Sequence, residues 1–313
     1  MLPDLLPLVI AALVGLRLQS WRHGERLRAR LWQANYVLVL PIAACYAFLS
    51  IDVDTRLVAA IACSLAAWWL TVGVSYAYAR TVARTRPMVG ALTFIGAFPN
   101  TGFIGYPLAH LAFGADGLRL AVIYDQVNLV VPSIVVATVF ARVLTDRDAA
   151  PAAAGAGERQ ASTFAIARRQ VLLSPPLWTA AVLIALRATV LHDPIELAAL
   201  GSVVGAIVGP IGFLLLGLSI PLHGFDHGRR EAATTVGASL IRLLVAPLLL
   251  AAIAFATGTH VPRVLYLCAA LPTAFHALVI SRLHDLEPAI VRLGVVITTI
   301  ASVTAVVGWV ALR

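Results

Sequence analysis

The stretch FPNTGFIGYP, residues 98–107, lies inside a run that is otherwise apolar enough to cross a membrane as a helix. It contains two prolines, two glycines and an Asn-Thr pair, which are poor helix formers. Because lipid offers no water to freed backbone groups, a break at this position must be buried in protein or face a watery cavity. The stretch therefore predicts an interrupted membrane helix.

The whole chain has the composition of a polytopic membrane protein. Of its 313 residues, 60% are hydrophobic and only 12% are charged, and the mean hydropathy of +0.91 lies far outside the soluble globular range. Apolar blocks long enough to span the bilayer recur along the full length. The candidate spans cover roughly residues 2–20, 33–50, 57–79, 88–113, 118–143, 171–191, 195–220, 232–257, 263–281 and 287–311.

The positions of the arginines predict how the chain is oriented in the membrane. The net charge is +8, but the basic residues lie in short loops between apolar blocks rather than in one stripe, which argues against nucleic acid as a partner. Most of them follow odd-numbered spans, so the positive-inside rule places both termini outside. The first apolar stretch precedes its arginines, which favours a retained helix over a cleaved signal peptide. We expect a multi-pass protein of a bacterial inner membrane.

An Ala/Gly-rich polar segment around residues 145–170 predicts a cytoplasmic linker. It divides the chain into a first half, residues 1–144, and a second half, residues 171–313, with five candidate spans each. An odd number of spans per half places the halves in opposite orientations, so a structural repeat has to be inverted.

Two pairs of prolines fall in corresponding spans of the halves. Pro41 corresponds to Pro210, and Pro99 corresponds to Pro272. Prolines in membrane helices often only introduce kinks, and for Pro41 and Pro210 this alternative is equally good. The second pair predicts interrupted helices at about 88–113 and 263–281, and such paired interruptions point to the binding site of a transporter.

Several classes of chemistry have no support in the sequence. Cys45, Cys63 and Cys268 have no metal or disulfide spacing, and the segment PLHGFDHGRR, which holds His223, Asp226 and His227, is more consistent with a polar loop than with a metal site. The chain has no HExxH, GxSxG, paired-aspartate or P-loop pattern. We therefore predict neither an enzyme nor an ATP-driven pump, and neither a cofactor nor a metal.

Two long stretches resemble the auxin efflux carrier family, which includes plant auxin exporters and bacterial carriers of small dicarboxylates such as malonate. They are FPNTGFIGYPLAHLAFGADGLRLAVIYDQVN, residues 98–128, and LPTAFHALVISRLHD, residues 271–285, which VITTIASV follows. The resemblance implies a scaffold domain and a crossover domain, with the broken fourth and ninth helices crossing at the midplane. It also implies alternating access by an elevator-like movement, and it is compatible with a homodimer.

The two breaks define the predicted binding site. A half-helix that begins at a break points its amide groups and its positive dipole end at the site, which favours an anion. Asn100 and Thr101 can add side-chain donors, and Gly102 and Gly105 allow close approach to the backbone. The predicted site residues are Pro99, Asn100, Thr101, Gly102, Gly105, Pro107, Pro272, Thr273 and His276. The alternatives are a packing kink, a Thr273 hydroxyl bonded to its own helix, and a packing role for His276.

Three further polar residues inside apolar runs are candidates for coupling or for a polar core: Asp125, Asn128 and Arg242. A carboxylate near the membrane edge can instead snorkel outward, and so can the arginine. Trp68 and Trp69 fit interface or packing aromatics.

The sequence favours a secondary carrier of small organic anions in the lipid bilayer. Two alternatives remain, namely a sodium-coupled importer similar to the bile acid carriers and a receptor or sensor that binds without transport. The coupling ion is left open between H⁺ and Na⁺.

Overall fold

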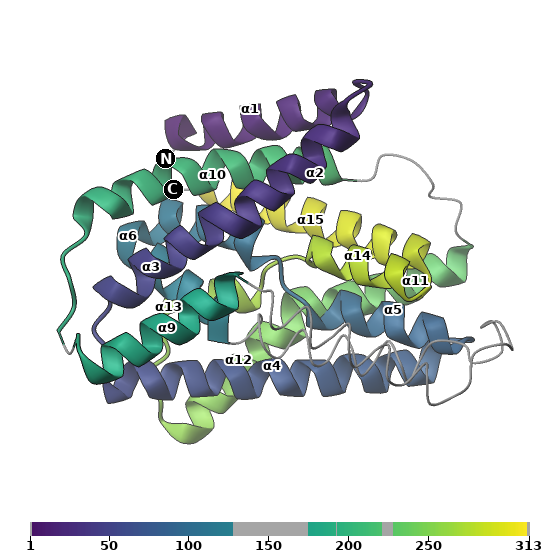
Figure 1. The fold of residues 1–313 in the computed structure, drawn as a ribbon. Helices are drawn as coiled ribbons and strands as arrows, with labels where there is room; N and C mark the ends of the chain where they lie inside the picture. The colour runs from purple at the N-terminus through teal and green to yellow at the C-terminus, as the bar shows by residue number, and fades with distance from the viewer. Residues whose placement is uncertain (1, 128–174, 192, 221–227, 312–313) are drawn as a thin grey trace, which may run out of the picture.

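The computed structural model describes residues 2–127, 175–191, 193–220 and 228–311 (Figure 1). Within these ranges the chain is helical, and its only β-structure is one isolated bridge. Five of the described helices are long and apolar enough to cross a membrane: 24–50, 55–82, 199–219, 229–257 and 288–305. The prediction of an all-helical, polytopic membrane protein is confirmed.

The helices of the first half are α1 (Leu2–Gln19), α2 (Gly24–Ala34), η1 (Asn35–Val39), α3 (Leu40–Ser50), α4 (Thr55–Val82), α5 (Arg86–Ala97), η2 (Thr101–Gly105) and α6 (Tyr106–Asp125). Those of the second half are α9 (Pro175–Thr189), α10 (Ala198–Ser219), α11 (Arg229–Leu240), η5 (Ile241–Val245), α12 (Ala246–Thr257), α13 (Arg263–Ala269), α14 (Phe275–Leu283) and α15 (Pro288–Ala311).

The π-helical turns η1, η2 and η5 have a common cause. Each is followed directly by a proline in the first turn of the next segment, namely Pro41, Pro107 and Pro247. Proline lacks an amide hydrogen and its ring clashes with the carbonyl four residues back, so a wider turn accommodates it. Pro41 therefore lies in a continuous span, and Pro210 lies inside α10. Neither proline interrupts its helix.

Helices occupy most of the described parts of the predicted spans, and the largest differences are at two boundaries. The second span begins at Gly24 rather than at residue 33. The boundary expected between residues 113 and 118 is a kink within α6, where Gly114 adopts φ 67° and ψ −155°. Most of span 118–143 and the whole linker 145–170 lie outside the described residues. The number of ten spans and the inverted repeat therefore stay predictions.

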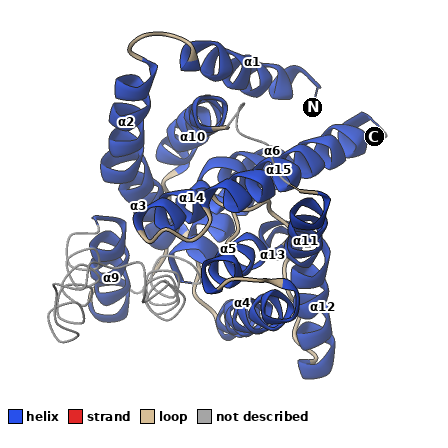
Figure 2. Cartoon of the chain, turned by 90° about the vertical axis from the view of Figure 1, so that its right-hand side faces the viewer, coloured by secondary structure: helices blue, strands red, loops and turns tan. Residues whose placement is uncertain are grey.

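Close contacts between helices depend on small residues. α1 runs along α10, as both views show (Figures 1 and 2). A Cβ on Gly15 of α1 would collide with the α10 backbone at Leu214, and a Cβ on Gly217 of α10 would collide with the α1 backbone at Ala12. Two helices approach to this distance in lipid only when small residues face each other. On the other side of the molecule, α4 packs against α5 and α12.

The basic connections gather at one end of the molecule. In Figure 1 the α1–α2, α4–α5 and α14–α15 connections all lie at the right-hand end, together with the start of α11, whereas both termini lie at the left. These connections and the helix turns beside them contain the arginines between residues 22 and 30 and between 80 and 86, with Arg229, Arg230, Arg282 and Arg292. The charge asymmetry of the sequence is therefore an asymmetry between the two ends of the fold.

Candidate site at the crossing of two broken helices

The first break separates α5 from η2. α5 ends at Ala97, after which Phe98 is extended (φ −103°, ψ 104°) and Asn100 is also non-helical (φ −90°, ψ 71°). Pro99 between them explains the break, because proline excludes the helical conformation of the residue before it and has no amide hydrogen. The helix resumes at Thr101 and continues through η2 into α6.

The second break separates α13 from α14. α13 ends at Ala269, and α14 begins at Phe275. Pro272 lies in the non-helical connection, and Ala274 before α14 is extended, with ψ 146°. The break that the sequence predicts around Pro272 is thus present in the fold.

The two breaks touch each other. They form an isolated antiparallel bridge between Pro99 and Thr273. The backbone N–H of Asn100 donates to the Pro272 carbonyl over 2.7 Å, and the backbone N–H of Ala274 donates to the Phe98 carbonyl over 2.8 Å. Backbone groups that left their helices therefore satisfy one another, as the absence of water requires.

Thr273 holds this crossing in place with its hydroxyl and its backbone N–H. Its hydroxyl donates to the Ile95 carbonyl of α5 over 2.8 Å, and its amide donates to the Thr298 hydroxyl of α15 over 3.0 Å. The alternative that Thr273 bonds a carbonyl of its own helix is wrong. The residue instead connects the second break to α5 and α15.

The carbonyl ends of α5 and α13 meet at Arg242. This side chain is 1% exposed, so the alternative that it snorkels to the surface is wrong. Its guanidinium donates to the Ala97 carbonyl over 3.0 Å and also to the Ala269 carbonyl, and only Nε lacks a partner among the described residues. Cations are stabilised at helix C-termini. Arg242 is therefore a fixed cation between two helix ends, and it forms no ion pair with Asp125 in the described part of the chain.

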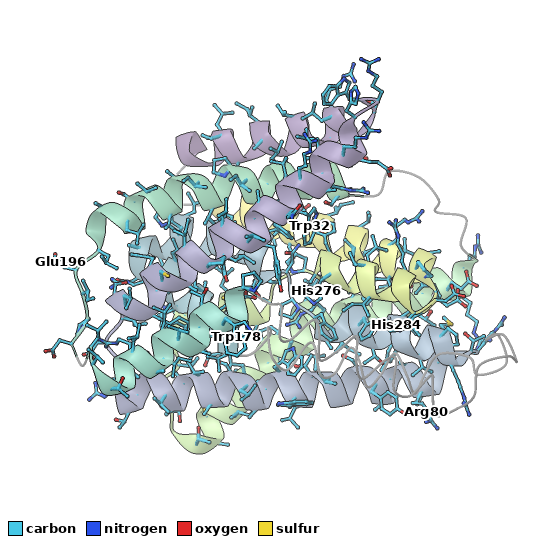
Figure 3. The ribbon with its side chains drawn as sticks, in the orientation of Figure 1. Trp32, Arg80, Trp178, Glu196, His276 and His284 are labelled. Atoms are coloured by element: carbon cyan, nitrogen blue, oxygen red, sulfur yellow. The ribbon has the colours of Figure 1, made fainter. Side chains whose placement is uncertain are left out.

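The amide ends of the half-helices, at η2 and α14, lack a side-chain partner of this kind in the described part of the chain. Neither segment has a side-chain cap. Asn100 is 2% exposed, yet its Nδ2 has no hydrogen-bond partner among the described residues. His276, which Figure 3 labels near the middle of the molecule, packs edge-on against Phe98 at 5.4 Å between ring centroids, and its Nε2 also has no described partner. One buried side-chain donor, Asn100 Nδ2, and one histidine ring nitrogen thus lack described partners where the two half-helices begin.

The two glycines of the first break have different surroundings. A Cβ on Gly105 would lie 2.5 Å from Leu271 Cδ1, so this glycine lets the second break pack against η2. A Cβ on Gly102 would meet only Leu40 Cδ2, at 3.8 Å. The alternative of small-residue packing thus describes Gly105, whereas the backbone at Gly102 remains approachable.

A family model described as "Membrane transport protein" matches residues 2–310. The chain belongs to the auxin efflux carrier family of membrane transport proteins. It is also similar to a protein named "Uncharacterized transporter" from Methanothermobacter thermautotrophicus strain Delta H, with 28% identity over 238 residues, which cover 75% of this chain and 72% of the relative.

In this auxin efflux carrier family member, Asp125 belongs to a buried cluster of polar side chains near the first break. It is 9% exposed and accepts a hydrogen bond of 2.7 Å from the Tyr106 hydroxyl, so the alternative that it snorkels outward is wrong. The Thr101 hydroxyl lies near this carboxylate. Asn128 lies outside the described residues, as do His223, Asp226 and His227.

Sequence reasoning missed three residues of this family member's crossing. Trp68 is 2% exposed and donates to the Ala97 carbonyl over 3.0 Å, so it supports the same helix end as Arg242. Thr298 accepts from Thr273, and both amide atoms of the buried Gln126 lack a described partner. A mid-span tryptophan and the polar residues of VITTIASV and YDQVN were the available signals. In the described part of the chain, no group of histidine, cysteine and carboxylate side chains has a metal-binding arrangement.

Proposed function

We propose that this membrane transport protein is a secondary carrier of small organic anions, such as mono- or dicarboxylates, and that it binds the anionic group where η2 and α14 begin. The observation that carries the proposal is the buried side-chain nitrogen of Asn100, Nδ2, which has no hydrogen-bond partner among the described residues and lies beside two half-helices without side-chain caps. A carboxylate accepts hydrogen bonds from such donors and is favoured by the positive dipole ends.

The surroundings of this position support a ligand rather than a packed core. Gly102 leaves the backbone accessible, and the His276 ring presents a nitrogen without a described partner. A carboxylate at Asn100 would satisfy donors that otherwise cost free energy in a dry interior. Asp125 accepts a hydrogen bond from Tyr106, and no described carboxylate accepts one from the Asn100 side-chain nitrogen.

The proposed mechanism is alternating access, in which the crossing moves as a unit past the α1–α10 side of the molecule. Hydrogen bonds through Asn100, Ala274 and Thr273 connect the two breaks and favour their moving together. In this proposal the arginine-rich end faces the cytoplasm of a bacterial cell, both termini face out, and the halves form an inverted repeat.

A sodium-coupled importer is the second candidate, and Arg242 argues against it. Carriers that use sodium coordinate the ion with free carbonyls and helix C-termini at the break. Here the Ala97 and Ala269 carbonyls already accept from Arg242. A cation is thus built into the position where a coupling ion would bind, which favours coupling to protons or transport down the gradient alone.

Flux measurements in proteoliposomes test the proposal. Purified protein is reconstituted with trapped malonate or benzoate, and exchange of the radiolabelled anion is followed against empty liposomes, first with sodium and then with N-methylglucamine as the only cation. We expect saturable anion exchange that does not depend on sodium. Binding without flux under any gradient would leave a receptor, and flux that requires sodium would favour the second candidate.

A further inference from the structure

A second cavity lies at the arginine-rich end, apart from the crossing. It has a volume of about 500 Å³ and lies between the ends of α1, α2 and α10 on one side and α14 and α15 on the other. Its polar lining includes Arg28, Arg282 and Arg292, which come from three different helices. No carboxylate lines it among the described residues. A cavity of this size holds a small organic molecule.

Two of these arginines, Arg28 and Arg282, have one carboxylate near them among the described residues. Arg282 is within electrostatic reach of both other arginines and of one carboxylate, Glu25. Glu25 lies 3.6 Å from Arg28, but its side chain is 92% exposed, so water screens the pair. The guanidinium groups of Arg28 and Arg282 on one concave surface attract an anion, and the planar group of arginine matches a carboxylate with two hydrogen bonds.

The remaining wall is aromatic and leads toward the first break. Trp32 and Phe275 both line the cavity, and the Trp32 indole N–H donates to the Ser219 hydroxyl over 3.3 Å, which fixes its ring. Phe103 of η2 contacts Trp32 at 4.5 Å and Phe275 at 6.3 Å between ring centroids. Trp32 is labelled on α2 in Figure 3. The aromatic wall of the cavity is thus in contact with η2, the segment that Asn100 precedes.

We infer that this cavity is a loading site for organic anions with an apolar or aromatic body, which deepens the proposed function and rests on it. Arg28 and Arg282 bind the carboxylates, Trp32 and Phe275 contact the apolar body, and Phe103 connects this aromatic wall to the crossing. An aromatic dicarboxylate fits this lining better than a monocarboxylate, because more than one guanidinium is available. A neutral aromatic amide has no group for the arginines to bind.

Binding of three probes tests the inference: phthalate, benzoate and the neutral benzamide. Each is measured by equilibrium dialysis on the full chain in phosphatidylcholine nanodiscs. We expect phthalate to bind most tightly and benzamide least. The variants Arg28→Gln and Arg282→Gln should each weaken phthalate binding by about fivefold, the effect of losing one partly exposed ion pair. Added salt should weaken wild-type binding more than binding by the double variant.

Arg84→Gln and Arg230→Gln are matched controls, because these arginines belong to the same end of the molecule but line a different cavity. Phthalate binding that is equal in wild type and in both test variants would overturn the inference. A lipid headgroup offers similar anionic chemistry, so the dialysis is repeated in nanodiscs that contain phosphatidylglycerol. Loss of the arginine-dependent binding there would identify a lipid site and overturn the loading role, whereas unchanged binding supports it.

The outcome is separate from that of the proposed function. The first distinguishing result is that wild type exchanges anions while Arg28→Gln and Arg282→Gln show the same KM as wild type for anion added on the arginine-rich side. That result would overturn the loading site and leave the proposed carrier function intact. If phthalate binding depends on Arg28 and Arg282 but no anion crosses the membrane, the carrier fails and the loading role falls with it.

Discussion

The two kinds of helix end at the crossing differ in how their polar groups are satisfied. The carbonyl ends of α5 and α13 accept hydrogen bonds from Arg242, and Trp68 supports one of them. The amide ends at η2 and α14 have no side-chain cap, and Asn100 beside them has a buried nitrogen without a described partner. Both ends face the same requirement to satisfy polar groups without water. The protein therefore completes the carbonyl ends with its own side chains, and in the proposed function a bound anion completes the amide ends.

Of the substitutions considered, the removal of Arg242 should change the stability of the crossing most. Arg242→Ala leaves the Ala97 and Ala269 carbonyls facing each other without a donor cation, and we expect a loss of about 3–5 kcal/mol in the free energy of unfolding. Thermal unfolding in detergent micelles measures it, with Arg84→Ala as the control because Arg84 is an exposed arginine of the α4–α5 connection. Arg242→Lys keeps the charge but not the two-pronged geometry, so it should recover only part of the stability. An Arg242→Ala protein as stable as the Arg84→Ala control would show that the carbonyl ends do not need the cation.

A smaller effect is expected from Thr273, which connects the breaks. Thr273→Val keeps the shape of the side chain but removes the donor to the buried Ile95 carbonyl, so we expect a loss of about 1–3 kcal/mol. Thr273→Ser keeps the hydroxyl and should stay close to wild type. The same unfolding measurement applies, and equal stability of the Val and Ser variants would contradict a crossing fixed by this bond.

The crossing also separates what the sequence predicts from what it leaves open. Pro99 and Pro272 predict the two breaks, because a mid-span proline beside Gly, Asn or Thr has no stable helical alternative in lipid. The partners of Thr273 and Arg242 belong to other helices, far away in the chain, and an unaligned sequence does not state which elements meet. Hydropathy alone leaves open whether a polar side chain in an apolar run snorkels or is buried. For Asp125 and Arg242 the packing of neighbouring helices decides it, and both are buried.

Asn100→Ala should give the smallest change in stability and the sharpest test of the comparison. The Asn100 side-chain nitrogen donates to no described group, so its removal breaks no hydrogen bond from this nitrogen to the described residues, and we expect the free energy of unfolding to stay within about 0.5 kcal/mol of wild type. Anion affinity should nevertheless fall by about tenfold or more, because a donor to a charged ligand is lost.

Thr71→Ala is the matched control, since it removes a buried hydroxyl that already donates to the Ala67 carbonyl of its own helix. It should leave anion affinity unchanged. Stability and anion binding are measured on the same preparations, by thermal unfolding and by equilibrium dialysis with radiolabelled malonate. If Asn100→Ala is as destabilising as Thr273→Val while binding is kept, the amide ends are completed by the protein like the carbonyl ends, and the site lies elsewhere.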